Sequence, residues 1–347
     1  MKFKREQKTG NFLTNLAGNQ LKDKIYGSEN VRECVLVDLI NSFPVQRLKG
    51  IAQFGIPDEY SHKKGFSRYE HSIGVFILLR KLNADLGEQS AGILHDVSHT
   101  AFSHVIDGVM GDSTREDYQD KRHEEFIKNS CVKNILEKYD FDYKKISKLE
   151  NFSLLEREMP SLCADRLDYS LRELEMSKGF DFVNNIFLDL ENKNNQIVFK
   201  TKEIAEIFAK EYMLLQKENW GSNQARVRYY LLSSVLKKAL DNRIIVFDDL
   251  NKTDKEVLEK LNSCNDKYVL ENLNLLRNNL SIVYSDDGIE LKKKFRYIDP
   301  EISVNGSFKK LSELSNEYKK IIDLEKHNSQ KIKKVKYFKK NGNPNIF

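Results

Sequence analysis

The chain has 347 residues, 31% of them charged and only five of them proline, and its formal net charge is +5. This length allows one large or two modest domains with a core that excludes water from a site. Four widely spaced cysteines without a Cys-x-x-Cys pair exclude a disulfide framework and indicate a reducing compartment. No apolar stretch approaches the roughly 20 residues of a membrane span, and residues 1–6 lack an apolar signal core. We therefore expect a cytoplasmic protein without a membrane partner.

The second of two predicted helices ends at the adjacent pair His95 and Asp96. Residues 72–82 and 86–94 both show apolar side chains at helical spacing, and β-branched and hydroxyl residues interrupt the pattern at 97–100. In the middle of a helix, neighbouring side chains point about 100° apart and cannot both bind one ion. At a helix end the bent backbone lets them converge, so this pair is a candidate metal site.

Histidines are concentrated in the same segment. Five of the seven lie within 53 positions, namely His71, His95, His99, His104 and His123. A single histidine is most often a hydrogen-bonded structural residue. Because protonated imidazoles repel one another, a cluster favours a bound metal or phosphate instead. Imidazole nitrogens and carboxylate oxygens together bind divalent ions that activate water for attack on phosphorus.

Later elements are mostly helical, with a few strands. Helical spacing predicts helices over residues 154–176, which carry Asp165 toward the core, and over 204–215 and 225–239. A turn is predicted at 220–223. Alternating apolar residues predict strands, which we expect to form a small sheet on the helical core, over 196–200, 289–298 and 332–338.

The sequence thus predicts a mostly α fold with a small C-terminal α/β part. The best boundary lies near residue 245, between a helical core (1–245) and an α/β region (246–347) with a basic tail. Residues 326–347 contain seven lysines and no acid, so without them the net charge of +5 falls to −2 for residues 1–325. Such a tail is most often a solvated surface, but nucleic acid or a regulatory nucleotide is a candidate partner.

Four longer blocks resemble the HD superfamily of metal-dependent phosphohydrolases and, within it, the deoxynucleotide triphosphohydrolase (dGTPase-like) branch. The blocks are residues 46–53 (QRLKGIAQ), 68–75 (RYEHSIGV), 95–108 (HDVSHTAFSHVIDG) and 165–169 (DRLDY). Weaker similarity continues through residues 247–250 and 253–257. The resemblance implies the HD-domain helical fold and, because resembling triphosphohydrolases are oligomers with nucleotide sites between subunits, a homo-oligomer.

Carried over residue by residue, the resemblance implies a set of metal ligands: His71, His95, Asp96 and Asp165. All four offer nitrogen or oxygen and none the thiolate of a structural zinc site, so the cofactor is a divalent ion such as Mn, Fe, Mg, Zn, Ni or Co. The resemblance also implies a proton-transfer set around the reacting phosphate: His99, His104, Asp107, His123 and Glu124. Such groups donate or accept protons near neutral pH, as attack of water and departure of a phosphate oxygen require.

Four further positions bear on the substrate. Arg68 lies one helical turn before His71 and suits a phosphate oxygen, or else a surface ion pair. Gln53 matches a family glutamine that reads the sugar 3′-hydroxyl. Tyr169 matches a tyrosine that crowds the 2′ position and favours deoxyribose, although helix packing also explains it. Glu173 replaces a sugar-reading aspartate and extends its carboxylate by about one bond length.

These residues predict an enzyme that acts on a nucleotide or another phosphorylated small molecule. The leading reaction is hydrolysis of a deoxynucleoside triphosphate to deoxynucleoside and triphosphate. A phosphomonoesterase, a phosphodiesterase or a nuclease with the same ions is the alternative within catalysis. A nucleotide-sensing or nucleic-acid-binding protein with a regulatory HD site is the alternative outside it, and the proton-transfer set disfavours it because a binding module needs none.

Overall fold

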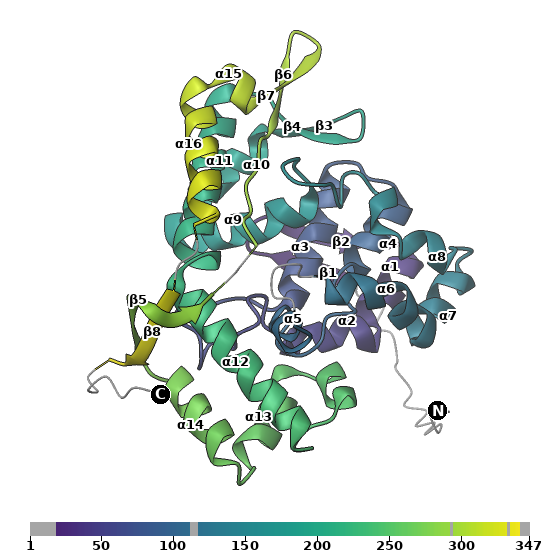
Figure 1. Cartoon of the computed structure of the whole chain (residues 1–347). Helices are drawn as coiled ribbons and strands as arrows, with labels where there is room; N and C mark the ends of the chain where they lie inside the picture. The colour runs from purple at the N-terminus through teal and green to yellow at the C-terminus, as the bar shows by residue number, and fades with distance from the viewer. Residues whose placement is uncertain (1–18, 112–116, 292–293, 332–333, 341–347) are drawn as a thin grey trace.

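The computed structural model describes residues 19–111, 117–291, 294–331 and 334–340. Most of these residues are helical, as the sequence predicts, and Figure 1 shows α1–α8 on one side, α9–α11 beside them with α15 and α16, and α12–α14 below. The helices are α1 (Cys34–Asn41), α2 (Phe43–Arg47), α3 (Arg68–Lys81), α4 (Leu86–Leu94), α5 (Val105–Val109), α6 (Tyr118–Asn129), α7 (Cys131–Lys138), α8 (Tyr143–Ile146), α9 (Ala164–Lys178), α10 (Phe180–Asp189), α11 (Lys202–Leu215), α12 (Asn223–Asp241), α13 (Asp254–Asn262), α14 (Lys267–Leu276), α15 (Leu311–Leu314) and α16 (Asn316–Ser329).

The strands form three separate small sheets within the described residues, so the expectation of one sheet is wrong. The strands are β1 (Asn19–Asp23), β2 (Gly27–Val31), β3 (Leu190–Lys193), β4 (Gln196–Phe199), β5 (Leu280–Glu290), β6 (Glu301–Val304), β7 (Ser307–Lys310) and β8 (Lys334–Lys339). β1 pairs with β2, β5 pairs with β8, and the third sheet has the order β3-β4-β6-β7, in which β4 and β6 are parallel. The mostly α fold with a small C-terminal α/β part is confirmed.

Two predicted elements differ from the structure. The helix predicted over 154–176 begins only at Ala164, because Pro160 lacks a backbone N–H and cannot lie inside a helix. The strand predicted over 289–298 is largely wrong, because β5 covers only residues 289–290 of it and residues 294–298 belong to none of the described strands. The strands predicted over 196–200 and 332–338 are confirmed as β4 and β8, although residues 332–333 lie outside the described ranges.

The core consists of two hydrophobic clusters. The larger packs α1–α4 with α6, α7, α9–α11 and α16, and it includes Phe76 and Phe208. The smaller packs α12–α14 with α5, β5 and β8, so residues on both sides of position 245 contribute to it. Val97 belongs to the larger cluster and Phe102 to the smaller. The loop between them therefore crosses from one cluster to the other, and it carries several of the predicted site residues.

Helix α3 is the central helix of the larger cluster, since residues 71–79 are buried on every side. Its first turn is fixed by a capping box, in which the side chains of Ser67 and Glu70 each accept the other's backbone N–H. Helix α4 approaches α3 closely, because a Cβ atom at Gly92 would lie only 2.4 Å from Leu79 Cδ1. At the end of α4, Nε2 of His95 lies 3.2 Å from Nε2 of His71 in the first turn of α3.

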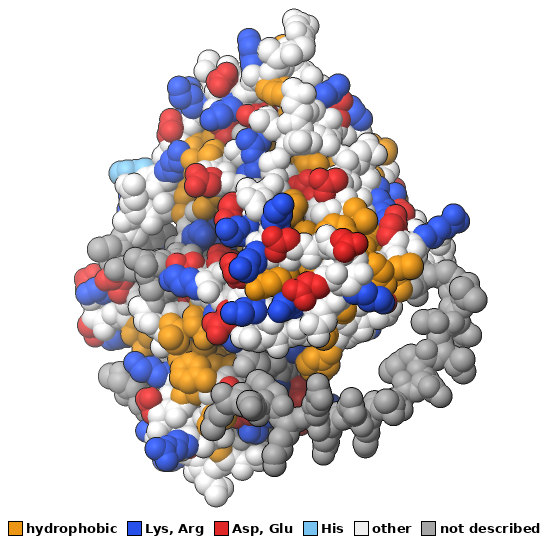
Figure 2. Space-filling model, turned by 90° about the vertical axis from the view of Figure 1, so that its right-hand side faces the viewer, with side chains coloured by type: hydrophobic (Ala, Val, Ile, Leu, Met, Phe, Trp, Pro, Cys, Tyr) orange, Lys and Arg blue, Asp and Glu red, His pale blue; other side chains and the backbone are white. Residues whose placement is uncertain are grey.

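The longest described helix, α12, carries charged side chains near both ends, and none of the described helices has the length and hydropathy of a membrane span. Figure 2 shows acidic and basic side chains interspersed over one face of the molecule, with hydrophobic side chains in several small groups between them. On this face no large area carries charge of a single sign.

Candidate active site

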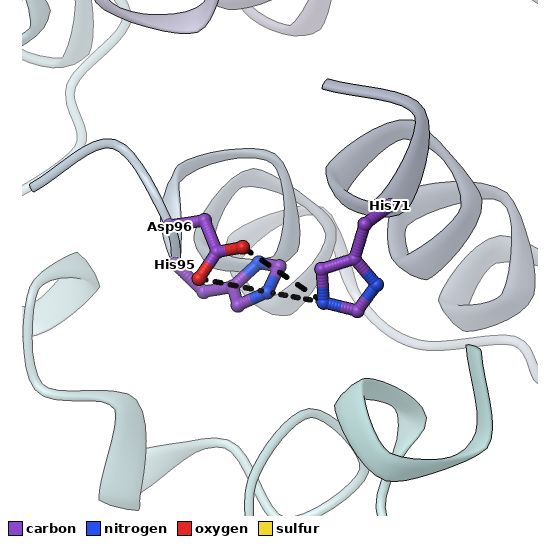
Figure 3. A group of neighbouring side chains, drawn as sticks. All are labelled: His71, His95 and Asp96. Carbon is purple, nitrogen blue, oxygen red and sulfur yellow. Dashed lines mark hydrogen bonds and ion pairs between the residues drawn. The ribbon is translucent and has the colours of Figure 1, made fainter. Parts of the chain in front are cut away.

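Three elements bring the predicted metal ligands together. His71 comes from the first turn of α3, His95 and Asp96 from the end of α4, and their ligand atoms all lie within 4.8 Å of one another (Figure 3). Asp165 comes from the first turn of α9, and its Oδ1 lies 2.9 Å from Nε2 of His71 and 3.8 Å from Nε2 of His95. The prediction that α4 ends at His95 and Asp96 is confirmed, because α4 spans Leu86–Leu94.

Hydrogen bonds determine which nitrogen of each imidazole faces this cluster. Nδ1 of His95 lies 2.7 Å from the carbonyl oxygen of Gly92, and Nδ1 of His71 lies 2.7 Å from Oδ2 of Asp168. Because these oxygens are acceptors, each Nδ1 carries a proton, which leaves Nε2 of each ring as the nitrogen that can coordinate an ion. The two Nε2 atoms lie 3.2 Å apart, with the carboxylates of Asp96 and Asp165 close by. Nitrogen and oxygen ligand atoms this close together repel one another unless a cation lies between them. These residues therefore fit a divalent ion.

The electrostatics of His71 also indicate an affinity for positive charge. Burial opposes a charge on the imidazole, but hydrogen bonds to Asp165 and Asp168 outweigh burial and raise the pKa of His71 to about 9. A metal ligand must be deprotonated at the coordinating atom, so a divalent ion competes with the proton at Nε2.

Asp168, to which the sequence analysis gave no role, links His71 to a buried ion pair. Arg172, one turn further along α9, donates to Asp168 from Nε at 2.7 Å and from Nη2 at 3.1 Å. The same Nη2 donates to Asp23, at the end of β1, at 2.6 Å. The pair lies so close to α3 that a Cβ atom at Gly74 would come within 2.1 Å of Asp168 Oδ1. Carboxylates placed in this way orient a histidine ligand and increase its basicity.

Arg68 is fully engaged with the protein, in contrast to the surface ion pair weighed from the sequence. The side chain is 3% exposed and donates from Nη1 to Asp96 at 2.6 Å and from Nε to Ser103 at 2.7 Å. Burial raises the pKa of Asp96, but the charge of Arg68 outweighs burial and holds that pKa well below its usual range. Arg68 therefore keeps Asp96 ionised and fixes its orientation.

The loop after Asp96 carries the next two predicted residues. Nε2 of His99 lies 3.3 Å from Asp96, and the rings of His99 and His104 meet edge to face. Asp107 is buried behind His104, with Oδ2 3.4 Å from its Nδ1. This arrangement supports the predicted pairing of an imidazole with a carboxylate.

The backbone of this loop is held in an unusual conformation. Phe102 and Ser103 both have positive φ angles, 62° and 48°, which non-glycine residues adopt only at a cost. The carboxylate of Asp254, at the start of α13, accepts the backbone N–H of Phe102 at 2.7 Å and that of Ala52 at 2.8 Å. Asp254 thus joins the smaller hydrophobic cluster to two loops of the site.

His123 presents an acceptor to the site. Ser98 Oγ donates its proton to Gln119 at 2.5 Å, so the contact of 3.0 Å between Ser98 Oγ and His123 Nδ1 requires the proton on Nδ1. Burial, assisted by the charge of His95, lowers the pKa of His123 to about 4, so the ring is neutral at physiological pH. Among the described residues no donor reaches its buried Nε2.

These residues surround a cavity of about 470 Å³. Ten of the predicted site residues line it: Gln53, Arg68, His95, Asp96, His99, His104, His123, Asp165, Tyr169 and Glu173. His71 and Asp107 lie buried behind the residues that line the cavity. His71 contacts Asp165, and Asp107 contacts His104. Glu124 is exposed on α6 and is not part of the lining. The predicted catalytic role of Glu124 therefore has no support in the geometry.

An aromatic wall forms the side of the cavity next to α9. The ring of Tyr169 packs edge to face against Trp220, at 5.2 Å between centroids, and its hydroxyl lies 2.5 Å from that of Tyr212. Glu173 is buried and accepts hydrogen bonds from Trp220 Nε1 and, at 2.6 Å, from Asn219 Nδ2. Both carboxylate oxygens of Glu173 are therefore already engaged. Asn219 and Trp220 belong to a π-helical turn (Gln216–Trp220), a feature frequent at functional sites.

A second group of possible ligands, Glu156, Cys163 and Asp165, lies beside the metal cluster. Arg166 donates to Glu156 at 2.9 Å and to Cys163 Sγ at 3.0 Å. The guanidinium already supplies positive charge at this point, which disfavours a second cation. Glu156 and Arg166 line the cavity, as do Lys294 and Arg296, and the sequence analysis assigned a role to none of the four.

Comparisons with known proteins agree with this geometry. Residues 68–169 match the HD domain family. The chain is 38% identical over 332 residues to the uncharacterized protein YdhJ of Bacillus subtilis. The matched residues make up 92% of this chain and 98% of YdhJ. It is 36% identical over 218 residues to the metal-dependent phosphohydrolase cns2 of Cordyceps militaris. These residues make up 60% of this chain and 63% of cns2.

Solved structures share the fold. A phosphohydrolase from Bacteroides thetaiotaomicron superposes with a TM-score of 0.63 at 18% identity, covering 92% of this chain and 98% of that one. A hypothetical protein from Aquifex aeolicus superposes with the same TM-score of 0.63 at 21% identity, and the match covers 92% of this chain and 95% of that one.

Fold and site together define an HD-type metal-dependent phosphohydrolase. Within this class the chain belongs to the family of YdhJ, which it matches over nearly its whole length.

Proposed function

We propose that this phosphohydrolase converts a deoxynucleoside triphosphate to deoxynucleoside and triphosphate. The observation that carries the proposal is the composition of one cavity. The metal cluster lies on one wall, an aromatic wall of Tyr169 and Trp220 on another, and both basic and acidic side chains contribute to the rest of the lining. A nucleotide needs each of these, since it combines an electrophilic phosphorus, a flat base and sugar, and additional anionic phosphates.

His71, His95, Asp96 and Asp165 would hold one divalent ion, which supplies a Lewis acid that polarises the phosphate and lowers the pKa of water. The protein's own contribution is orientation and proton transfer. Arg68 and Asp168 fix two of the ligands. The buried Nε2 of His123 can accept a proton, and Asp107 fixes the orientation of His104 so that its ring can donate one.

Two buried acceptors support a polar ligand in this cavity. Oε1 of Gln53 and Nε2 of His123 have no hydrogen-bond partner among the described residues. Leaving such atoms unpaired costs roughly 1–3 kcal/mol each, so a ligand that donates to them gains affinity. For Gln53 the resemblance to triphosphohydrolases suggests that this donor is the sugar 3′-hydroxyl.

The experiment is to incubate the purified protein with Mn²⁺ and a panel of deoxynucleoside and ribonucleoside mono-, di- and triphosphates, and to separate the products by ion-exchange chromatography. Release of inorganic triphosphate from deoxynucleotides supports the proposal. Release of orthophosphate alone, or equal activity on phosphates without a nucleoside, would remove it. The variant Asp96→Asn is the control for contaminating phosphatases.

A nucleotide phosphomonoesterase is the second candidate, and Glu173 favours it. In the triphosphohydrolases that this chain resembles, an aspartate at this position reads the sugar. Here the longer Glu173 is engaged by Trp220 and Asn219, so it is less available to a sugar hydroxyl. The same panel separates the candidates, because a monoesterase releases orthophosphate from nucleoside monophosphates.

A further inference from the structure

Arg47, the last residue of α2, is a buried cation whose three hydrogen bonds all end on backbone carbonyl oxygens. Its Nη2 donates to the carbonyl oxygen of Val97 at 2.9 Å and to that of His99 at 2.6 Å. Its Nη1 donates to the carbonyl oxygen of Lys252 at 3.1 Å. The residue is only 5% exposed and does not line the cavity. Arg47 therefore reaches the loop after Asp96 from outside the cavity.

The guanidinium keeps its charge in this buried position. Burial lowers the pKa of Arg47 to about 10, although the charge of Asp254 opposes the fall. The group is therefore protonated at physiological pH, and its charge must be compensated by the groups around it. Because hydrogen bonds from an ionised donor are about twice as strong as neutral ones, the three carbonyl groups are held firmly.

Two of these carbonyl groups belong to the residues on either side of Ser98. The hydroxyl of Ser98 lies 3.0 Å from Nδ1 of His123, and this contact fixes the proton on Nδ1 and leaves Nε2 as an acceptor. His99, whose own carbonyl group is held, lines the cavity with its Nε2 3.3 Å from Asp96. One guanidinium thus determines the position of His99 directly and that of His123 through Ser98.

The third carbonyl group connects this loop to the segment before α13. The carbonyl oxygen of Leu250, two residues before Lys252, accepts the backbone N–H of Ala101 at 2.8 Å. The segment that contacts Arg47 therefore also holds the loop at a second point. The guanidinium is thus part of a frame of hydrogen bonds around the loop.

The candidate metal ligands beside this loop are oriented by other contacts. Nδ1 of His95 lies 2.7 Å from the carbonyl oxygen of Gly92, and Asp96 accepts a hydrogen bond from Arg68 at 2.6 Å. Neither contact involves Arg47. A change at Arg47 should therefore affect the proton-transfer histidines more than the bound ion.

We propose that Arg47 is a positioning residue for proton transfer, which holds His99 and His123 at the reacting phosphate. The inference rests on the proton-transfer part of the proposed function and not on which phosphate ester reacts. It gives two buried arginines different tasks, since Arg68 orients a metal ligand and Arg47 orients the loop that follows this ligand.

The test compares Arg47→Lys with the wild type, because lysine keeps the charge but cannot reproduce the planar fork that reaches three carbonyl groups. Arg228→Lys is the matched control. Arg228, on α12, is also buried and likewise donates to three backbone carbonyl oxygens, those of Tyr60, Leu276 and Asn278. Like Arg47, it does not line the cavity.

Three quantities are measured in each protein. Competition with a chelating indicator gives the affinity for Mn²⁺. Turnover with Mn²⁺ gives kcat and KM on the nucleotide of the panel above that the wild type hydrolyses fastest. The ¹⁵N chemical shifts of the histidine rings are recorded with Mg²⁺, which does not broaden the signals, and His123→Ala identifies the signal of His123. Because protonated and unprotonated ring nitrogens differ widely in shift, this spectrum reports which nitrogen carries the proton.

We expect Arg47→Lys to lower kcat by about 10 to 100-fold, the scale on which a small misplacement of a catalytic group acts. KM and the affinity for Mn²⁺ should change by less than about twofold, and His123 should no longer carry its proton on Nδ1 alone. Arg47→Gln, which also removes the charge, should lose more, so that lysine recovers part of the loss. It also replaces Arg47→Lys if that variant does not fold. Arg228→Lys should keep the kcat and the spectrum of the wild type even if it unfolds at a lower temperature.

The positioning role is overturned if Arg47→Lys retains the kcat of the wild type or its His123 spectrum. It is also overturned if the affinity for Mn²⁺ falls in parallel with kcat, or if Arg228→Lys loses kcat equally, since the effect would then be on the ion or on the fold. If kcat depends on Arg47 but nucleotides release only orthophosphate, the positioning role stands and the triphosphohydrolase reaction fails. If no nucleotide is hydrolysed, the proposed function fails and the spectrum of His123 decides the inference.

Discussion

The carboxylate of Asp168 lies 2.7 Å from Nδ1 of His71, on the side of the imidazole opposite to the metal cluster. Both side chains are completely buried, so the contact is not shared with water. Asp168 in turn is held by Arg172, and Arg172 by Asp23 at the end of β1. The orientation of one candidate metal ligand is thus determined by a chain of ionic hydrogen bonds that reaches the N-terminal strand pair.

The first prediction concerns this contact. Asp168→Asn should lower the affinity for the divalent ion by about 10 to 100-fold, because the amide neither orients His71 nor increases its basicity as the carboxylate does. Competition with a chelating indicator measures the affinity. Asp181→Asn, at an exposed position of α10, is the control. Unchanged metal affinity in Asp168→Asn would show that the contact serves the fold alone.

His95→Ala and Asp96→Ala should lose both the bound metal and hydrolysis while retaining the helical circular dichroism spectrum. Each removes one of four ligands, whereas the two hydrophobic clusters are built from other residues. Elemental analysis and turnover should fall together. A variant that is free of metal and still active would contradict the assignment of the metal centre.

His104→Ala and His123→Ala should instead keep the metal and lose about 10²-fold or more in turnover, the usual magnitude for a proton-transfer group. His327→Ala, at an exposed position on α16, is the control and should remain fully active. If His104→Ala also loses the ion, this residue is a ligand rather than a proton donor.

The sugar preference should depend on the ring of Tyr169 rather than on its hydroxyl. Tyr169→Ala should raise activity on ribonucleotides relative to deoxyribonucleotides, because it removes the side chain expected to crowd the 2′ position. Tyr169→Phe, which loses only the contact with Tyr212, should keep the preference. Gln53→Ala should lower activity on both sugars. If the ratio of ribonucleotide to deoxyribonucleotide activity is unchanged in Tyr169→Ala, residues other than Tyr169 select the sugar.

Stability should depend on pH through Asp254. Burial raises the pKa of this carboxyl from the model-peptide value of 3.8 to about 6, although two backbone hydrogen bonds oppose the rise. The folded state therefore binds the proton more tightly, so the contribution of Asp254 to stability is present below about pH 4 and is lost as the pH rises through 6. Between pH 5 and 7.5 the loss is about 1 kcal/mol. Urea unfolding of wild type and Asp254→Asn at both pH values measures it, and a stability difference that does not vary with pH would refute the prediction.

The candidate metal ligands could be named from the sequence because they lie in short blocks that resemble a known family, and the structure brings three of them within 4.8 Å of one another. His95 and Asp96 also follow from helix periodicity, since the end of α4 was correctly placed. Asp168 was not identified, although it lies in one of these blocks, because its role depends on the distance between α3 and α9. That distance is set by Gly74, which leaves room for Asp168 and Arg172 against α3.

The alternation over residues 289–298 was real but was attributed to the wrong structure. Periodicity of two shows that alternate side chains face different surroundings, and a sheet is the usual cause. In residues 294–297 the two surroundings are a hydrophobic core and a cavity lined largely by polar and charged side chains, so no strand partner is needed. Sequence spacing alone does not distinguish these cases, because both give the same pattern.

The segment that carries Lys294 and Arg296 is anchored independently of the metal ligands, since the hydroxyl of Tyr318 donates to the carbonyl oxygen of Ile298 at 2.6 Å. Exchange of these two side chains among related enzymes would alter the charge offered to a substrate while the reactive centre stays the same. The positive charge that this segment brings to the cavity thus comes from residues more than 100 positions away from Asp165 in the sequence. Comparison of substrates within the family should therefore begin with this segment and only then turn to the histidines.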